Sequence, residues 1–291
     1  MLMTARQLQQ QLGSPNLVVF DCRFSLADRE AGRNAYLAGH IPGAFYLDLE
    51  QDLSGQKGTH GGRHPLPNPQ ELAAKLGAAG VDDQASVVVY DDGGGMAARA
   101  WWLIRYLGHE QVAVLDGGWK AWLAAGGAAD TGMPKLHPTT FPLDVREDWV
   151  LSVDDVMQIV AGERAGRLVD ARAAVRYRGE VEPLDPKAGH IPGAANLPWE
   201  SHLQPDGTWK PAQALREAIA PLVQSAGDAA NVVNYCGSGV TACANVFALA
   251  LAGFGDSKLY AGSWSDWCSY DDLPVATGEA PGTEDAPPGR G

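Results

Sequence analysis

The sequence has no apolar run long enough to cross a membrane. A transmembrane helix needs about 20 apolar residues in a row, and no segment of the 291 residues approaches that pattern. The first residues, Met1 to Leu8, lead into polar glutamines and not into the apolar core of a secretory signal. We therefore expect a cytoplasmic protein.

Positive charge is also scarce. The chain has 22 lysines and arginines against 35 aspartates and glutamates, which gives a formal net charge of −13. Such a balance opposes binding to nucleic acid or to an anionic membrane, although a local basic pocket can still hold a small anion. The expected partners are therefore small molecules, with no nucleic acid and no membrane.

Cysteines are few, and they form neither a disulfide framework nor a Cys-x-x-Cys metal pair. They stand at positions 22, 236, 243 and 268. His60 and His64 have the spacing of helical metal ligands, but the glycines between them and the following proline rule out a helix there. The glycine run 93–95 lacks the pattern of a dinucleotide-binding loop. We predict no metal and no cofactor.

What the sequence does contain is an internal repeat. The segment Gly39–Ala44, Gly-His-Ile-Pro-Gly-Ala, recurs unchanged as Gly189–Ala194. Shorter matches follow in the same order: Asp21-Cys22-Arg23 with Asp170-Ala171-Arg172, Val88-Val89-Tyr90 with Val233-Asn234-Tyr235, and Gly117-Gly118-Trp119 with Gly262-Ser263-Trp264. A period this long indicates a duplicated domain. Each repeated aspartate is expected to accept backbone amides or to pair with a nearby arginine.

Each copy alternates short apolar strands with helical patterns. Strands are expected at 17–20, 86–90, 112–115, 168–169 and 231–235, and helices at 69–76, 97–107, 153–160 and 241–251. This alternation predicts an α/β fold in which each domain is an open, mainly parallel sheet with helices on both faces. We expect a first domain at 1–128, a linker at 129–148, a second domain at 149–277 and a disordered tail at 278–291.

Cys236 follows the apolar run 231–235 and opens the loop Cys236-Gly237-Ser238-Gly239-Val240-Thr241. Ligands of parallel sheets bind beyond the carboxyl ends of strands, which is where this thiol is expected. Glycines let several backbone amides converge, and a following helix adds the positive end of its dipole, so a thiolate is favoured. We expect the amides of Gly237, Gly239, Val240 and Thr241 to hold the bound anion. The alternative is a tight turn that happens to contain a cysteine.

The first copy has Asp91 where the second has Cys236. Only the second copy can therefore perform thiol chemistry at this place. A cysteine phosphatase or arsenate reductase would also use such a thiolate loop, but those loops end in arginine, and no arginine lies between Cys236 and Gly255. A sulfur carrier or sensor module without turnover is a further alternative.

The cysteine loop, the doubled Gly-His-Ile-Pro-Gly-Ala and the doubled Gly-x-Trp resemble the two-domain rhodanese family. The resemblance covers the chain to about Thr277. It implies two tandem rhodanese-like domains and a sulfurtransferase in which Cys236 carries sulfur as a persulfide to a thiophilic acceptor, such as cyanide, a small thiol or a reduced redox protein. Gly237 and Ser238 are similar to the branch that uses 3-mercaptopyruvate, whereas the thiosulfate:cyanide branch has bulkier, cationic residues there.

The resemblance also implies where the donor binds. Arg176 matches the family arginine that binds the donor carboxylate, and its planar fork suits that group. A second family arginine commonly follows a Glu-Pro pair, but Leu184 stands at that position here. Arg178 and Lys187 are the alternatives for the missing charge.

A proton relay is the last implied feature. Ser238, His64 and Glu50 match the serine, histidine and carboxylate that the mercaptopyruvate branch uses. A polarised serine would protonate the departing enolate or deprotonate the donor thiol, with a histidine that titrates near neutral pH. The alternative for His64 is a plain loop histidine.

Overall fold

The computed structural model describes residues 1–25, 28–92 and 95–279. The chain divides into two units, each with one sheet. The first comprises 1–55, 66–147 and 203–209, and the second comprises 56–65, 148–202 and the chain from 210 onward. The sequence repeat does not predict that segment 56–65 belongs to the second unit, or that segment 203–209 belongs to the first. Residues 93–94 of the glycine run and 280–291 of the predicted tail lie outside the described residues.

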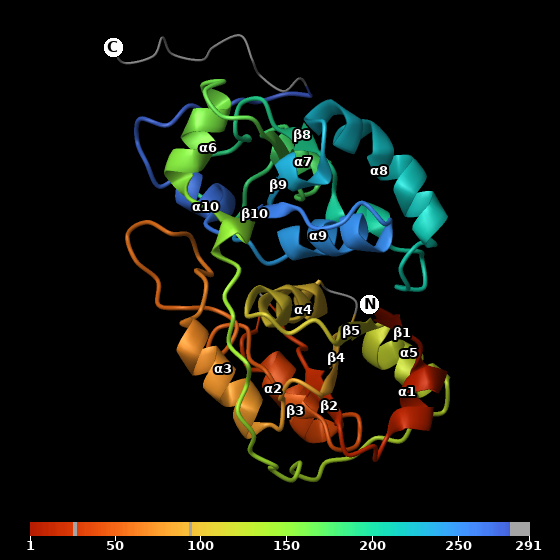
Figure 1. The fold of residues 1–291 in the computed structure, drawn as a ribbon. Helices are drawn as coiled ribbons and strands as arrows, with labels where there is room; N and C mark the ends of the chain where they lie inside the picture. The colour runs from red at the N-terminus through yellow and green to blue at the C-terminus, as the bar shows by residue number, and fades with distance from the viewer. Residues whose placement is uncertain (26–27, 93–94, 280–291) are drawn as a thin grey trace. The chain divides into compact units, whose positions relative to one another are not determined.

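The first unit is built on a parallel sheet with the strand order β1-β5-β4-β2-β3 (Figure 1). Its strands are β1 (Leu2–Met3), β2 (Leu17–Asp21), β3 (Phe45–Tyr46), β4 (Ser86–Tyr90) and β5 (Val112–Leu115), and its helices are α1 (Ala5–Gln11), α2 (Ala31–Ala38), α3 (Pro69–Ala78), α4 (Met96–Tyr106) and α5 (Gly118–Ala124). Asn68 caps α3, because its side chain accepts hydrogen bonds from the amides of Gln70 and Glu71.

The second unit repeats the plan with the parallel order β6-β10-β9-β7-β8. Its strands are β6 (Val150–Leu151), β7 (Arg167–Asp170), β8 (Ala195–Asn196), β9 (Val232–Tyr235) and β10 (Lys258–Tyr260), and its helices are α6 (Val153–Val160), α7 (Ala174–Tyr177), α8 (Ala212–Ala226), α9 (Ala242–Leu251) and α10 (Ser263–Trp267). Short 3-10 helices lie at Glu147–Trp149, Trp199–His202 and Ala229–Asn231. The predicted α/β fold is confirmed for both copies.

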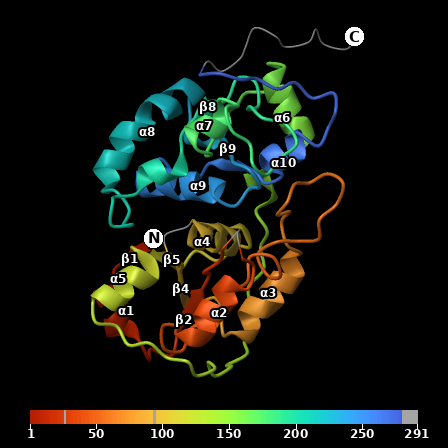
Figure 2. The same cartoon turned by 180° about the vertical axis from the view of Figure 1, so that it is seen from behind.

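Helices cover both faces of the second sheet. Seen from behind, α8 and α9 lie together on one side of it, and α6 and α10 lie on the other (Figure 2). The central strand β9 is buried along its whole length, which its apolar sequence explains. In the part of the chain that the structure describes, no helix is long and apolar enough to span a bilayer.

Candidate active site

Cys236 lies directly after the central strand β9, at its carboxyl end, as predicted. Its side chain is buried, with the residue only 2% exposed. The Cys236 amide donates to Ser263 Oγ at 3.1 Å, and its carbonyl accepts from the Trp264 amide at 3.0 Å. The first two residues of α10 therefore fix the backbone of the cysteine on both sides.

The glycines of the cysteine loop allow two close approaches. Gly239 has φ +77°, and a Cβ there would stand 2.2 Å from the Ala261 carbonyl oxygen, so only glycine fits. A Cβ on Gly237 would stand 3.0 Å from Nη2 of Arg63 and 3.4 Å from Nη1 of Arg176. The absence of a side chain at Gly237 thus leaves room for two guanidinium groups beside the residue that directly follows the thiol.

The α9 helix starts at Ala242, immediately behind the loop. The positive end of its dipole therefore lies near the segment 236–241, which favours an anion there. The roles expected for the amides of Gly237, Gly239, Val240 and Thr241 stay a prediction.

Two of the three predicted relay residues are brought together. His64 Nδ1 lies 2.8 Å from Ser238 Oγ, and both residues are buried. They are 174 positions apart in the sequence, and the contact forms because segment 56–65 belongs to the unit that contains the cysteine. This geometry allows proton transfer between the imidazole and the hydroxyl next to Cys236.

Glu50, the predicted third member of the relay, belongs to the first unit. Its amide donates to Asp48 Oδ1 at 2.8 Å, and its carboxylate lies 4.0 Å from Nε of the exposed Arg29. The part of Glu50 in the relay stays a prediction.

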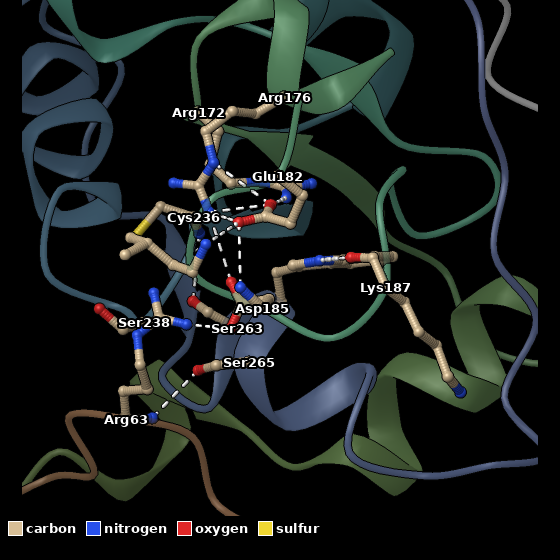
Figure 3. A network of polar contacts seen from close by, with 12 residues as sticks. Arg63, Arg172, Arg176, Glu182, Asp185, Lys187, Cys236, Ser238, Ser263 and Ser265 are labelled. Carbon is tan, nitrogen blue, oxygen red and sulfur yellow. Dashed lines mark hydrogen bonds and ion pairs between the residues drawn. The ribbon is translucent and has the colours of Figure 1, made fainter. Parts of the chain in front are cut away.

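Arg176, the predicted donor-binding residue, extends from the short helix α7 into a network of charges (Figure 3). Its Nη2 lies 2.6 Å from Glu182 Oε1 and 3.3 Å from Asp185 Oδ2. Arg172 Nη1 reaches the same glutamate at 3.2 Å. Burial alone would raise the pKa of Glu182, but hydrogen bonds from Arg176 and backbone amides outweigh it and hold that pKa below its ordinary value.

Asp185 shows the opposite shift. Burial raises its pKa, and the neighbouring Glu182 adds to the rise, while Arg63 and Arg176 oppose it. The Asp185 side chain pairs with Arg63 as well as with Arg176. Sequence reasoning missed Arg63, and the only available signal was its place next to His64.

Neither sequence alternative for the missing arginine supplies a charge at the thiol. Arg178 forms an ion pair with Glu180 at 2.7 Å. Lys187 donates to the Tyr270 carbonyl at 2.6 Å, and its side chain extends away from Cys236 (Figure 3). Leu184 itself is 52% exposed. Among the described residues, no group of three His, Cys, Asp or Glu side chains gathers as a metal site would need.

Comparisons with known proteins agree with this architecture. The model of the rhodanese-like domain matches the chain twice, at residues 4–125 and 152–270. The chain is 49% identical to a probable 3-mercaptopyruvate sulfurtransferase from Pseudomonas aeruginosa, over 96% of this chain and 98% of that one. It is 40% identical to SseB of Mycobacterium tuberculosis, a candidate thiosulfate sulfurtransferase, over the same shares of the two chains.

A solved structure leads to the same family. The crystal structure of SseA, a 3-mercaptopyruvate sulfotransferase from Escherichia coli, matches with a TM-score of 0.76 and 33% identity, over 91% of this chain and 98% of that one. The resemblance seen in the motifs is thereby confirmed. The chain belongs to the family of proteins built from rhodanese-like domains.

Proposed function

We propose that this protein is a sulfurtransferase that moves sulfur from 3-mercaptopyruvate to a thiophilic acceptor through a persulfide on Cys236. The observation that carries the proposal is the grouping of a buried cysteine, the Ser238 and His64 pair and the Arg176 guanidinium around one loop. The names of the relatives from Pseudomonas aeruginosa and Escherichia coli support the same donor.

In the first half-reaction the Cys236 thiolate attacks the sulfur of 3-mercaptopyruvate. A sulfur–sulfur bond forms and the carbon–sulfur bond of the donor breaks, which leaves the enolate of pyruvate and a protonated persulfide. The thiol proton of the donor then passes to the enolate carbon, so that the products are pyruvate and the persulfide anion. In this scheme the Ser238 and His64 pair carries that proton.

In the second half-reaction the acceptor attacks the outer sulfur of the persulfide. With cyanide, a carbon–sulfur bond forms and the sulfur–sulfur bond breaks, which gives thiocyanate and the Cys236 thiolate. No proton is needed in this step, because one anion replaces another.

The donor itself is held by charge. Arg176 supplies the positive charge that holds the donor carboxylate during the first half-reaction.

A comparison of donors tests this function. We would measure kcat/KM for 3-mercaptopyruvate and for thiosulfate with cyanide as common acceptor, on the wild type, on Cys236→Ser and on Cys22→Ala. Cys22 is a matched control, since the second copy has Ala171 at the corresponding place. We expect a ratio well above one for the wild type and the control, and no transfer by Cys236→Ser. Full activity of Cys236→Ser would refute the persulfide.

Thiosulfate is the second candidate donor. The relative from Mycobacterium tuberculosis favours it by its name, and two guanidinium groups beside Gly237 also suit a dianion. A ratio below one in the same experiment would assign the protein to this branch. A carrier or sensor, the non-enzyme alternative, would form one persulfide per chain and show no turnover with either donor.

A further inference from the structure

We propose that the first unit contains a small-molecule site of its own, a pocket that binds a small aromatic carboxylate. The pocket lies between α2, β3, α3 and the segment 133–136, and its volume is about 360 Å³. Pockets for small ligands have volumes from about 300 Å³ upward. We call it the aromatic pocket. All of its lining residues belong to the first unit, whereas Cys236 belongs to the second, so the proposal does not depend on sulfur transfer.

Two helices present matching faces to the aromatic pocket. Their lining residues are Arg33, Tyr36 and Leu37 on α2, and Lys75, Ala78 and Ala79 on α3 and its C-cap. Both sets have the spacing i, i+3, i+4, which places three side chains on one face of a helix. The helices α2 and α3 lie side by side in both views (Figures 1 and 2). The two alanines are short, so α3 leaves space where longer side chains would fill it.

Aromatic rings from the sheet and from α2 line the pocket. Phe20 on β2 pairs with Phe45 on the edge strand β3, and their ring centroids lie 5.9 Å apart. The Tyr36 and Tyr46 rings have centroids 5.4 Å apart. Both tyrosine hydroxyls donate to backbone carbonyls, at 2.9 and 3.1 Å. The hydroxyls are thus used by the protein, and the tyrosines offer ring surface to a ligand.

The second copy of the repeat lacks these rings on its strands. In the register of the repeat, the places of Phe20, Phe45 and Tyr46 are taken by Val169, Ala195 and Asn196. Asn196 donates to the Arg172 carbonyl at 2.9 Å, just as Tyr46 donates to the Arg23 carbonyl. An asparagine therefore satisfies the scaffold at this position. The rings of the first copy need another reason, and a ligand that packs against them supplies it.

The charged residues of the lining leave one positive charge. Lys75 forms an ion pair with Asp52. The third charged residue, Arg33, is exposed, and its guanidinium carbon lies 5.7 Å from the centroid of the Tyr46 ring. Within residues 1–25, 28–92 and 95–279, no carboxylate forms an ion pair with Arg33. A guanidinium that lies over a ring keeps its N–H donors for a carboxylate at its edge. The ligand should therefore be an anion.

The segment 133–136 closes one side of the pocket and is held at both ends. Before it, the Gly132 carbonyl oxygen lies 3.0 Å from Nε2 of His40. After it, the Thr139 amide donates to the Gly77 carbonyl at 2.8 Å, and a Cβ on Gly77 would stand 2.8 Å from the Thr139 carbonyl oxygen. The glycine thus lets the segment approach α3 closely. The pocket is therefore formed before a ligand enters.

The rim of the pocket is apolar and exposed. Leu37, Met133 and Leu136 are 52%, 77% and 63% exposed. Large apolar side chains that are exposed together mark a site of binding. The rings and the cation lie within a cavity of small-molecule size, so we assign a small aromatic anion to it and not a protein partner.

Two matched probes test the chemistry of the site. Isothermal titration calorimetry would compare 3-phenylpropionate with the uncharged 3-phenylpropionamide. The wild type should bind one carboxylate per chain at this site and bind the amide about tenfold more weakly, because the amide forms no charge-assisted pair. Arg33→Gln should weaken the carboxylate about tenfold and leave the amide unchanged, while Arg6→Gln, an exposed arginine on α1, should alter neither. Equal affinity of the wild type for the two probes, or no binding of either, would overturn the inference.

A blocking variant tests the place of binding. Ala78 is the exposed last residue of α3, so Ala78→Phe adds a ring to the pocket without removing a buried contact. Ala124→Phe at the exposed end of α5 is the matched control. Ala78→Phe should weaken 3-phenylpropionate by about tenfold or more, and the control should bind as the wild type does. Binding that survives Ala78→Phe but is lost in Arg176→Gln would place the probe at the sulfur-donor site and refute the pocket. If Ala78→Phe does not fold, the response of the two probes to Arg33→Gln decides.

Discussion

The two copies of the repeat share an arginine clamp and differ in the residue that follows the central strand. In each copy an aspartate at a strand end holds the arginine two residues later, at 2.6 Å for Asp21 with Arg23 and 2.7 Å for Asp170 with Arg172. Each arginine also donates at 2.6 Å to the first carbonyl of the Gly-His-Ile-Pro turn. The clamp occurs with and without a thiol, so it serves the fold.

The position after the central strand decides which copy can react. In the first copy the Asp91 carboxylate accepts from the Ala97 amide at 3.0 Å, near the start of α4. The amides at this helix start thus meet an anion of the protein itself. In the second copy Cys236 stands at that position, and α9 starts at Ala242 directly after its loop, where we predict that an anion binds. The comparison teaches that one scaffold can be made inert or reactive by a single loop.

A second difference lies in the Gly-x-Trp turn. Gly118 and Ser263 occupy the same place in the repeat, and both have φ of +58°. Glycine adopts this angle freely, whereas serine pays about 1–3 kcal/mol of strain. Ser263 donates to the Tyr260 carbonyl at 3.0 Å and accepts from the Cys236 amide. The strain occurs in the copy that contains Cys236, where the Ser263 hydroxyl accepts from the cysteine amide.

The largest expected effect comes from making the second copy like the first. Cys236→Asp should lower sulfur transfer by about a thousandfold or more, because the nucleophile is lost, while the fold persists since Asp91 is accommodated at the same place. Asp91→Cys should gain no activity, because Ser238, His64 and Arg176 all belong to the second unit. Steady-state assays on both variants check this, and sulfur transfer by a protein with both changes would contradict it.

The next largest effect is on stability, and it tests the arginine clamp that both copies share. Arg23→Ala and Arg172→Ala should each lower the free energy of unfolding by about 3–5 kcal/mol, because each leaves a buried aspartate unpaired. Urea unfolding followed by tryptophan fluorescence measures this, with the exposed Arg164→Ala as control, where about 0–1 kcal/mol is expected. Only Arg172→Ala should also weaken donor binding, since Arg172 contacts Glu182. If either variant loses no more unfolding free energy than Arg164→Ala does, the arginine clamp does not stabilise the fold.

A smaller effect on activity distinguishes the two sulfur donors, 3-mercaptopyruvate and thiosulfate. His64→Ala should lower kcat/KM for 3-mercaptopyruvate about a hundredfold, because the enolate must be protonated. Thiosulfate turnover should change much less, since sulfite leaves without a proton on carbon. The ratio of the two donor assays in His64→Ala is the measurement, with His60→Ala as a neighbouring histidine control. Equal losses for both donors would make His64 a structural residue.

The smallest effect concerns the strained turn. Ser263→Gly copies Gly118, so relief of strain should offset the lost hydrogen bonds, and stability should stay within about 1 kcal/mol of the wild type. Ser263→Ala keeps the strain and should lose about 1–3 kcal/mol. Both should slow alkylation of Cys236 by iodoacetamide several-fold, because the cysteine backbone loses a partner. Thermal melts and alkylation rates distinguish the two variants, and wild-type rates in both would show that Ser263 does not position the thiol.

The sequence predicts the parts of the site that depend on local pattern. The apolar run before Cys236 and the glycines after it indicate a thiol at the carboxyl end of a strand, and the structure confirms that place. The repeat predicts two copies of one α/β plan, which is also confirmed. The pairing of Ser238 with His64 came from the family resemblance, since no local pattern connects residues 174 positions apart.

The other parts of the site depend on backbone geometry that the residue types do not specify. Gly61 and Gly62 indicate a turn, but not that Gly62 contacts the Gly262 carbonyl and brings Arg63 to Gly237. Likewise, the exchange of Gly118 for Ser263 is visible in the sequence, whereas the positive φ at Ser263 is not. Long-range docking of a loop and the sign of a dihedral angle are decided by packing.

The most direct test of the account is the mass of the intact protein after incubation with 3-mercaptopyruvate and no acceptor. The account predicts that the wild type gains one sulfur atom, that peptide mapping places it on Cys236, and that cyanide removes it. Cys236→Ser should gain none. A sulfur atom on another cysteine, or pyruvate release by Cys236→Ser at the wild-type rate, would contradict the account.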